Sequence, residues 1–420
     1  MICDLFFHYF CKNFRQDYID RMDKINKIIF IIFLLIPFLG ISQVDIKISI
    51  DNQNDSVFYF CKYRGAKNVV IDTLKLENGI IHYKNKTKLP EGIYLLTNDK
   101  NYQMIEVLVG KKQKFSVSIN DLEDLNSAKA KNAKETDIYY RLMAKVRETD
   151  ANIKALKSEK EFYPENQMKI DSLRKDLEKF EESLKIKRKD AFINLVINSI
   201  KYRLIENYWD DFPLDDARIL TFPMIDNKLE TYFNNLPVDA ETINSEIDKL
   251  IVKTGDCTEV RDYLLWFFYV KYFNPNYMNL DDVYIHLVRE YFLKLDMKNV
   301  SKSVVNMMEE RANYLENLKL GAKIPEIGNL YSIESQYVAV VFYDKSCQKC
   351  AKEGRILEEI RTRHPEMTIY PVEISSTNIK NLMSLYDIQT TPMIYLLDNQ
   401  KNIIAKRLKA EQVEQFIKKE

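Results

Sequence analysis

Two cysteines separated by two residues, Cys347 and Cys350, stand between a run of apolar residues and a stretch with helical periodicity. The apolar run, Tyr337 to Tyr343, is rich in valine and aromatic residues and predicts a buried strand. The stretch that follows, Ala351 to Arg363, predicts a helix. Sulfurs at positions i and i+3 of a helix start are close enough to close a small disulfide ring. The chain must therefore fold so that both sulfurs lie where a strand ends and a helix begins.

The start of a helix gives the first of these cysteines a distinct chemistry. Backbone N–H groups and the helix dipole stabilise negative charge at that position, and the thiolate is the nucleophilic form of cysteine. Lys345 and Lys349 flank Cys347, and their charge is expected to lower its pKa further. Cys347 is therefore the predicted nucleophile. Cys350 is the predicted thiol that resolves the mixed disulfide formed with a substrate.

The rest of the C-terminal region alternates strand and helix patterns. Such alternation predicts an α/β sheet with parallel crossovers. Thr390-Thr391-Pro392 opens one of the strands, and a proline at the first residue of a strand removes a ladder donor, which marks the position as unusual. The predicted elements after the first helix are Met367 to Ile374, Asn378 to Tyr386, Met393 to Leu397, Ile403 to Leu408 and Glu411 to Lys419.

Together these motifs resemble the thioredoxin superfamily. The residues that carry the resemblance are Val340-Val341-Phe342-Tyr343, Cys347-Gln348-Lys349-Cys350, Tyr386 to Pro392 and Leu396-Leu397-Asp398. Within the superfamily the chain is similar to exported TlpA/ResA-like thiol–disulfide oxidoreductases of Gram-negative envelopes, in particular to multidomain forms with a β-domain and a helical domain ahead of the redox module. The resemblance implies that Pro392 is cis, packs against the cysteine pair and forms the catalytic site with Cys347 and Cys350. It also implies that the Thr391 backbone pairs with an extended substrate peptide.

Some positions depart from the pattern of that family. Ser346 stands where tryptophan is common, and Arg355 replaces the proline that kinks the thioredoxin helix. Val341 stands where thioredoxin has a buried acid, and Glu353 is the nearest acidic residue that could replace that acid. The short segment 375–377 lacks the insertion of the ResA type. These differences bear on rate and redox direction rather than on the basic chemistry.

The first 42 residues are predicted to be a signal peptide. Lys24 and Lys27 precede an apolar run from Ile28 to Ile41, and small residues precede a plausible cut before Gln43, which is the order of a secretory signal. The apolar run is shorter than the roughly 20 residues of a transmembrane helix. We therefore expect export to the periplasm or cell envelope, with no stable membrane span after cleavage. An uncleaved membrane anchor is the alternative.

The signal reads naturally from Met22, which makes residues 1–21 an upstream start-site artefact or a long n-region. Cys3 and Cys11 would be lost with it. Of the other two cysteines outside the close pair, Cys61 is expected to be a small buried residue. Cys257 lies in a predicted loop and is either free or paired with Cys61.

The sequence predicts a multidomain fold with a small all-β N-terminal domain, an all-α middle domain and an α/β thioredoxin-like C-terminal domain. Residues 43–122 contain short runs with a period of two, such as Val44 to Ile50, which predict a small antiparallel sandwich or barrel. Residues 123–318 show helical periodicity, and residues 319–420 hold the cysteine pair. The middle domain is interpreted either as a platform for a partner or substrate or as a spacer bundle.

The numbers of charged and of metal-ligating residues bear on which partners and cofactors the chain is expected to have. The chain has 62 Lys and Arg against 62 Asp and Glu, which argues against a nucleic-acid partner. A zinc site needs two further ligands beside the cysteine pair, and with only 4 histidines and no second CxxC we expect neither metal nor cofactor. The predicted partners are disulfide-bearing envelope proteins and an unidentified electron donor. The alternative function is a non-catalytic binding or scaffold protein whose cysteine pair is a structural or vestigial disulfide.

Overall fold

The structure is a computed structural model that describes residues 43–51, 55–98, 103–120, 125–158, 164–202, 205–297 and 300–417. The predicted signal peptide therefore lies outside the described residues. The chain divides into two compact units, residues 1–61 with 70–166 and residues 62–69 with 167–420. Within the described ranges, no helix has both the length and the apolar character needed to span a membrane.

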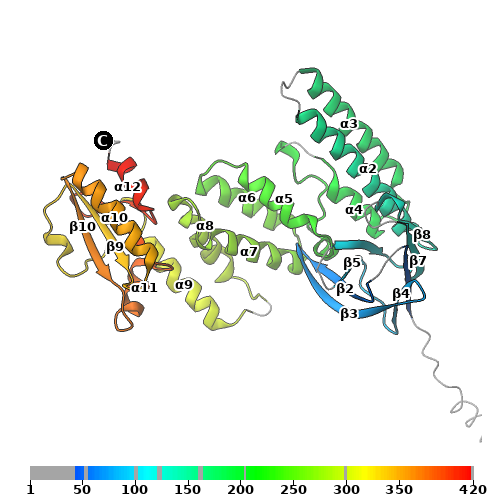
Figure 1. Cartoon of the computed structure of the whole chain (residues 1–420), viewed down its shortest axis with the longest axis horizontal. Helices are drawn as coiled ribbons and strands as arrows, with labels where there is room; N and C mark the ends of the chain where they lie inside the picture. The colour runs from blue at the N-terminus through cyan, green and yellow to red at the C-terminus, as the bar shows by residue number, and fades with distance from the viewer. Residues whose placement is uncertain are drawn as a thin grey trace, which may run out of the picture. The chain divides into compact units, whose positions relative to one another are not determined.

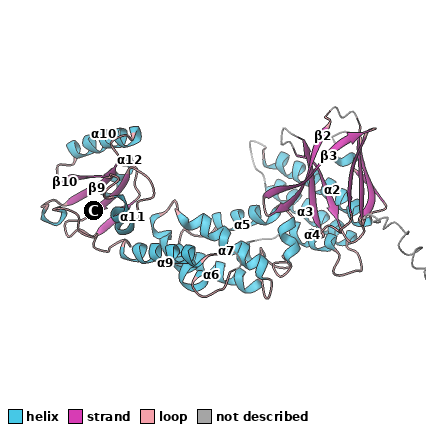
Figure 2. Ribbon diagram, turned by 90° about the horizontal axis from the view of Figure 1, so that it is seen from below, coloured by secondary structure: helices cyan, strands magenta, loops and turns pink. Residues whose placement is uncertain are grey.

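The strands of the N-terminal part form one curled sheet (Figures 1 and 2). Its eight strands lie in the order β6-β5-β2-β3-β4-β1-β7-β8. Successive side chains of a strand point to opposite faces of the sheet, so every second residue can be buried. In β1 the residues at every second position from Val44 are buried. The strands are β1 (Val44–Ile50), β2 (Val57–Arg64), β3 (Lys67–Glu77), β4 (Ile80–Asn85), β5 (Gly92–Asn98), β6 (Gln103–Val109), β7 (Lys114–Ile119) and β8 (Lys129–Lys131).

The predicted fold class is wrong in this part, because residues 43–122 do not form a small all-β sandwich or barrel. β1 pairs antiparallel with β4 but parallel with β7, so the sheet is mixed. β8 lies beyond residue 122 and completes the same sheet. Alternation of apolar and polar residues in a sequence identifies a strand and its buried face, but it does not identify the strand with which it pairs. The parallel pairing of β1 with β7 joins segments far apart in the chain and leaves no local signal.

Helices follow the sheet. In α6 the buried positions Ile243, Ile247, Leu250 and Ile251 recur at helical spacing and form one apolar face. Pro164 is the first residue of α3, a position where the missing N–H of proline costs nothing. The helices are α2 (Lys134–Lys157), α3 (Pro164–Leu184), α4 (Phe192–Ile200), α5 (Met224–Asn234), α6 (Ala240–Lys253), α7 (Thr258–Phe273), α8 (Asp281–His286) with a π-helical continuation (Leu287–Phe292), and α9 (Lys302–Asn317).

The C-terminal residues form a four-stranded sheet in the order β10-β9-β11-β12. β9 is parallel to β10 and antiparallel to β11, and β12 is antiparallel to β11. Pro371 is tolerated because β10 is an edge strand. The elements are β9 (Tyr337–Tyr343), α10 (Gln348–Arg363), β10 (Met367–Glu373), α11 (Ile379–Tyr386), β11 (Met393–Leu397), β12 (Ile403–Lys406) and α12 (Ala410–Ile417).

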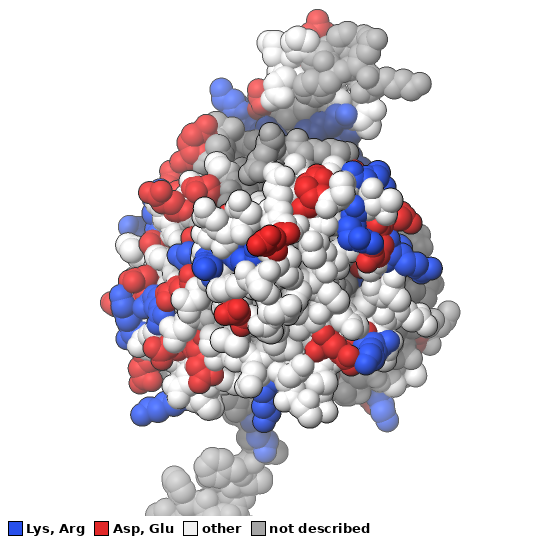
Figure 3. Space-filling model, turned by 90° about the vertical axis from the view of Figure 1, so that its left-hand side faces the viewer, with Lys and Arg blue, Asp and Glu red and all other residues white. Residues whose placement is uncertain are grey.

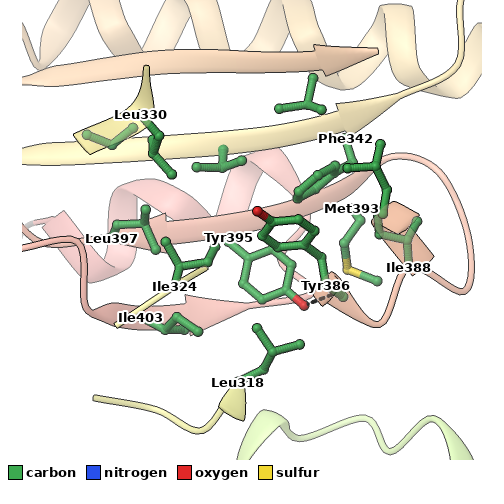
Figure 4. Close-up of a cluster of buried hydrophobic side chains, with 14 of the residues drawn as sticks. Leu318, Ile324, Leu330, Phe342, Tyr386, Ile388, Met393, Tyr395, Leu397 and Ile403 are labelled. Atoms are coloured by element: carbon green, nitrogen blue, oxygen red, sulfur yellow. Dashed lines mark hydrogen bonds between the residues drawn. The ribbon is translucent and has the colours of Figure 1, made fainter. Parts of the chain in front are cut away.

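Both faces of this sheet are covered, because β9 lies between two apolar clusters. On one face Phe342 packs against Tyr386 and Tyr395, with ring centroids 4.9 and 6.2 Å away (Figure 4). On the other face Val341 lies in a cluster with residues of α10 and α12 such as Leu357. A strand buried on both faces reads as a continuous apolar run, as β9 does. This buried strand ends at Tyr343, four residues before Cys347.

Candidate active site

A short turn carries the chain from β9 to the cysteine pair. The Asp344 carboxylate accepts hydrogen bonds from the Ser346 backbone N–H and hydroxyl, at 2.7 and 2.6 Å. The Cys347 N–H donates to the Asp344 carbonyl at 3.1 Å. Cys347 has an extended backbone (φ −82°, ψ 105°) and is the N-cap of α10. The turn therefore places the Cys347 sulfur where the first N–H groups of the helix have no partner of their own.

The two sulfurs differ in exposure and in acidity. Cys347 is partly exposed, and its sulfur accepts the Cys350 N–H at 3.1 Å, whereas Cys350 is buried. Hydrogen bonding from the Cys350 thiol, assisted by the Cys350 N–H, holds the pKa of the Cys347 thiol below its usual value. Burial raises the pKa of the Cys350 thiol, and its hydrogen bond to Cys347 raises it further. Cys347 is thus the thiol of this pair that ionises first.

The proline loop meets the first cysteine. The Thr391–Pro392 peptide bond is cis, which confirms what the resemblance implied. The Cys347 thiol donates to the carbonyl oxygen of Thr391, which belongs to that peptide unit, over 3.9 Å. Thr391 and Pro392 are both half-buried. The structure therefore brings together the four site residues predicted from the sequence.

A buried ion pair holds the start of this loop. Asp387 follows α11 in a left-handed conformation (φ 45°) and is buried. Its carboxylate accepts hydrogen bonds from Arg311 Nε at 2.8 Å and Nη2 at 3.1 Å, and from Gln389 Nε2 at 3.0 Å. Sequence reasoning missed Arg311, which stands 76 residues before Asp387. An arginine within an amphipathic helix pattern looks like a surface residue, so the sequence carried no signal for the pair.

Lys345 and Glu353, two charged residues near the cysteine pair, have partners other than the cysteines. The Lys345 ammonium lies 2.7 Å from the Glu373 carboxylate, and Lys349 lowers the pKa of Cys347 through its backbone N–H. Glu353 is buried and accepts the Ala410 N–H at 2.6 Å, so it caps α12. Hydrogen bonds from the Cys350 thiol, from the Thr391 side chain and from the backbone N–H groups of Cys350 and Lys349 therefore supply the local stabilisation of the Cys347 thiolate.

Three further observations concern the cysteines, the metal ligands and the surface charge. Cys61 and Cys257 are free thiols, as are Cys347 and Cys350. Among the residues that the structure describes, no group of His, Cys, Asp and Glu side chains could hold a metal ion. On the face of the molecule shown in Figure 3, basic and acidic side chains are interspersed. The site itself is a reduced cysteine pair beside a cis-proline peptide.

Comparison with known families and curated proteins gives one match outside the cysteine site. A family model for a domain of unknown function, DUF4369, matches residues 44–139, the segment from β1 into α2. No curated protein matches the chain.

Solved structures similar to the chain include three bacterial proteins. A thioredoxin-like protein from Bacteroides caccae is 16% identical, covers 53% of this chain and 92% of its own, and has a TM-score of 0.42. A domain of a possible thiol-disulfide isomerase from Cytophaga hutchinsonii is 25% identical over 24% of this chain and 91% of its own, with a TM-score of 0.22. The thioredoxin domain of a thiol-disulfide oxidoreductase from Bacteroides vulgatus is 22% identical over 24% and 97%, also with a TM-score of 0.22. These TM-scores are below 0.5, so the function must be argued from the site itself.

Proposed function

We propose that the chain is a thiol–disulfide oxidoreductase that reduces or isomerises disulfides of other proteins through Cys347 and Cys350. The observation that carries the proposal is the arrangement of two thiols at a helix start: the partly exposed Cys347 sulfur at the N-cap of α10 accepts the Cys350 N–H at 3.1 Å, while Cys350 is buried. The more acidic thiol is the accessible one, and the less acidic thiol is buried behind it. This is the arrangement that a nucleophile and a resolving thiol need.

The reaction moves two electrons from the cysteine pair to the substrate. The Cys347 thiolate attacks one sulfur of a substrate disulfide, which breaks the substrate S–S bond and forms a mixed disulfide. The first substrate sulfur leaves as a thiolate and takes up a proton. The Cys350 thiol then gives up its proton and attacks the Cys347 sulfur, and the second substrate thiolate leaves and is protonated. Cys347 and Cys350 end as a disulfide, which a donor dithiol must reduce before the next turnover.

Thr391 is the proposed contact for the substrate backbone. It precedes β11, whose pairing with β9 begins at Met393 opposite Phe342, so its main chain lies outside that ladder. An extended peptide could pair with this segment as an added strand and so bring its disulfide to Cys347. Pro392 completes the proposed catalytic site, because it follows Thr391, whose carbonyl lies 3.9 Å from the Cys347 sulfur.

The proposed location is the periplasm or cell envelope, and it rests on the signal-like order of residues 1–42. The proposed partners follow from that location. They are envelope proteins that carry disulfides and a dithiol electron donor.

Disulfide reduction by the purified chain tests this function. With dithiothreitol as the donor, the chain from residue 43 onward should accelerate the reduction of insulin disulfides. Cys347→Ser should abolish the acceleration, and Cys257→Ser, at a half-buried cysteine outside the site, should retain it. If the wild type and Cys347→Ser are equally inactive while both are folded, the chain is a binding or scaffold protein instead.

A further inference from the structure

Arg311, on α9, makes a two-pronged contact with Asp387 at the end of α11. Nε and Nη2 donate to the two carboxylate oxygens at 2.8 and 3.1 Å, and both side chains are buried. A two-pronged contact of this kind fixes direction as well as distance. The Asp387 carboxylate can therefore neither rotate nor withdraw without losing a charged hydrogen bond.

The guanidinium is itself held in place. Its centre lies 3.8 Å from the Phe273 ring centroid and 4.8 Å from that of Tyr284. Nη2 also donates to the Asn274 side-chain oxygen at 3.1 Å. Aromatic faces attract a cation and add to the fit. Arg311 is thus a fixed point from which Asp387 is held.

Asp387 opens the segment that ends at the cis peptide bond. The Gln389 side chain folds back onto the same carboxylate at 3.0 Å. On the N-terminal side of Asp387, the Tyr395 hydroxyl donates to the Tyr386 carbonyl at 2.5 Å (dashed line in Figure 4). The path from the ion pair to Thr391, whose carbonyl meets the Cys347 sulfur, is therefore short and held at its beginning.

We propose that Arg311 is a positioning residue for the thiol site, which holds residues 387–392 through Asp387 so that Thr391 stays against Cys347. The inference rests on the proposed function, since the placement of Thr391 matters to the reaction only if Cys347 is the nucleophile. Stability alone explains the pair poorly, because well-packed apolar residues often replace a buried ion pair without loss. The directional, two-pronged geometry is what a positioning role requires.

The test measures the pH midpoint of Cys347 alkylation in the folded chain. Arg311→Gln and Asp387→Asn should both release the loop, remove the hydrogen bond from the Thr391 side chain that lowers the pKa of Cys347, and so raise the midpoint. A shift of about half a pH unit would leave about threefold less thiolate at pH values well below the midpoint. Arg311→Lys keeps the positive charge but cannot make the two-pronged contact with Asp387. Its alkylation midpoint should therefore lie between those of the wild type and Arg311→Gln.

The two main variants separate positioning from direct electrostatics. Removing the positive charge of Arg311 disfavours a nearby thiolate, whereas removing the negative charge of Asp387 favours it. Positioning predicts a rise in both variants, and a purely electrostatic effect predicts opposite signs. Arg289→Gln is the matched control, because Arg289 binds Glu309 and Glu316 on an exposed side of α9. Its midpoint should equal that of the wild type.

Each outcome decides the matter. A rise in both variants supports the inference, and an unchanged midpoint or opposite shifts would overturn it. If neither variant folds, Arg311 is a structural residue and the inference is also wrong. A wild type that shows a low midpoint but reduces no disulfide refutes the proposed function alone, because the midpoints of the variants still report on the loop.

Discussion

The backbone N–H of Cys350 points at the sulfur of Cys347, 3.1 Å away, while the Cys350 sulfur lies buried behind it. The second cysteine therefore stabilises the negative charge of the first, and it is itself shielded from solvent. This relationship gives the two thiols an order of reaction, and the predictions below follow from it and from the fold that supports it.

Alkylation of the reduced chain should depend on pH in a defined order. Cys347 has a lowered pKa, so its reaction with iodoacetamide should rise with a midpoint below the ordinary thiol value of about 8.5. Cys350 has a raised pKa and is buried, so its reaction should begin only at higher pH. Peptide mass spectrometry after pulses at increasing pH measures both.

Cys61 provides an internal control in the same experiment. It is buried, and burial raises its pKa, so it should remain unmodified until the protein is denatured. Equal modification of Cys61 and Cys347 near neutral pH would show that the accessible, acidic thiol of this account does not exist.

Glu353 should matter for stability rather than for thiol chemistry. Glu353→Ala leaves the Ala410 N–H without its acceptor at the start of α12, and a buried unsatisfied donor costs about 1–3 kcal/mol. Glu353→Gln keeps an acceptor oxygen and should lose less. Urea unfolding measures the loss, and the alkylation midpoint of Cys347 should stay unchanged in both variants. A large shift of that midpoint would instead assign Glu353 to the thiol site.

Phe342 should be a main source of stability in the C-terminal sheet. It is fully buried at the centre of the sheet and contacts the rings of Tyr386 and Tyr395. Phe342→Ala should lower the free energy of unfolding by about 3–5 kcal/mol. Met383→Ala, at an exposed position of α11, is the control and should change stability little. Comparable losses in the two variants would contradict the described core.

The local features of the C-terminal region were predictable from the sequence. The predicted strands Tyr337 to Tyr343 and Met393 to Leu397 have the bounds of β9 and β11. Both are short apolar runs limited by turn residues, which is the clearest local signal a strand can have. The predicted helix begins at Ala351, whereas α10 begins at Gln348, because Cys347 itself caps the helix.

The features that depend on distant partners were not predictable. Alternation identified β1 as a strand, yet its parallel partner β7 is determined by packing of the whole sheet. Asp387 falls between the predicted helix that ends at Tyr386 and the predicted strand that begins at Met393, and its partner Arg311 lies in a different predicted domain. Lys345 was expected to act on Cys347 because it is close in the sequence, but its charge is directed at Glu373 on β10. Long-range pairing of this kind follows from the assembled fold.

The most direct measurement is the capture of a mixed disulfide on the variant Cys350→Ser. With the resolving thiol removed, Cys347 should form a stable adduct with a peptide disulfide at neutral pH, and mass spectrometry should find that adduct on Cys347 alone. The matched variant Cys347→Ser should capture almost none. No adduct on Cys350→Ser, or equal capture by both variants, would contradict the assignment of Cys347 as the nucleophile.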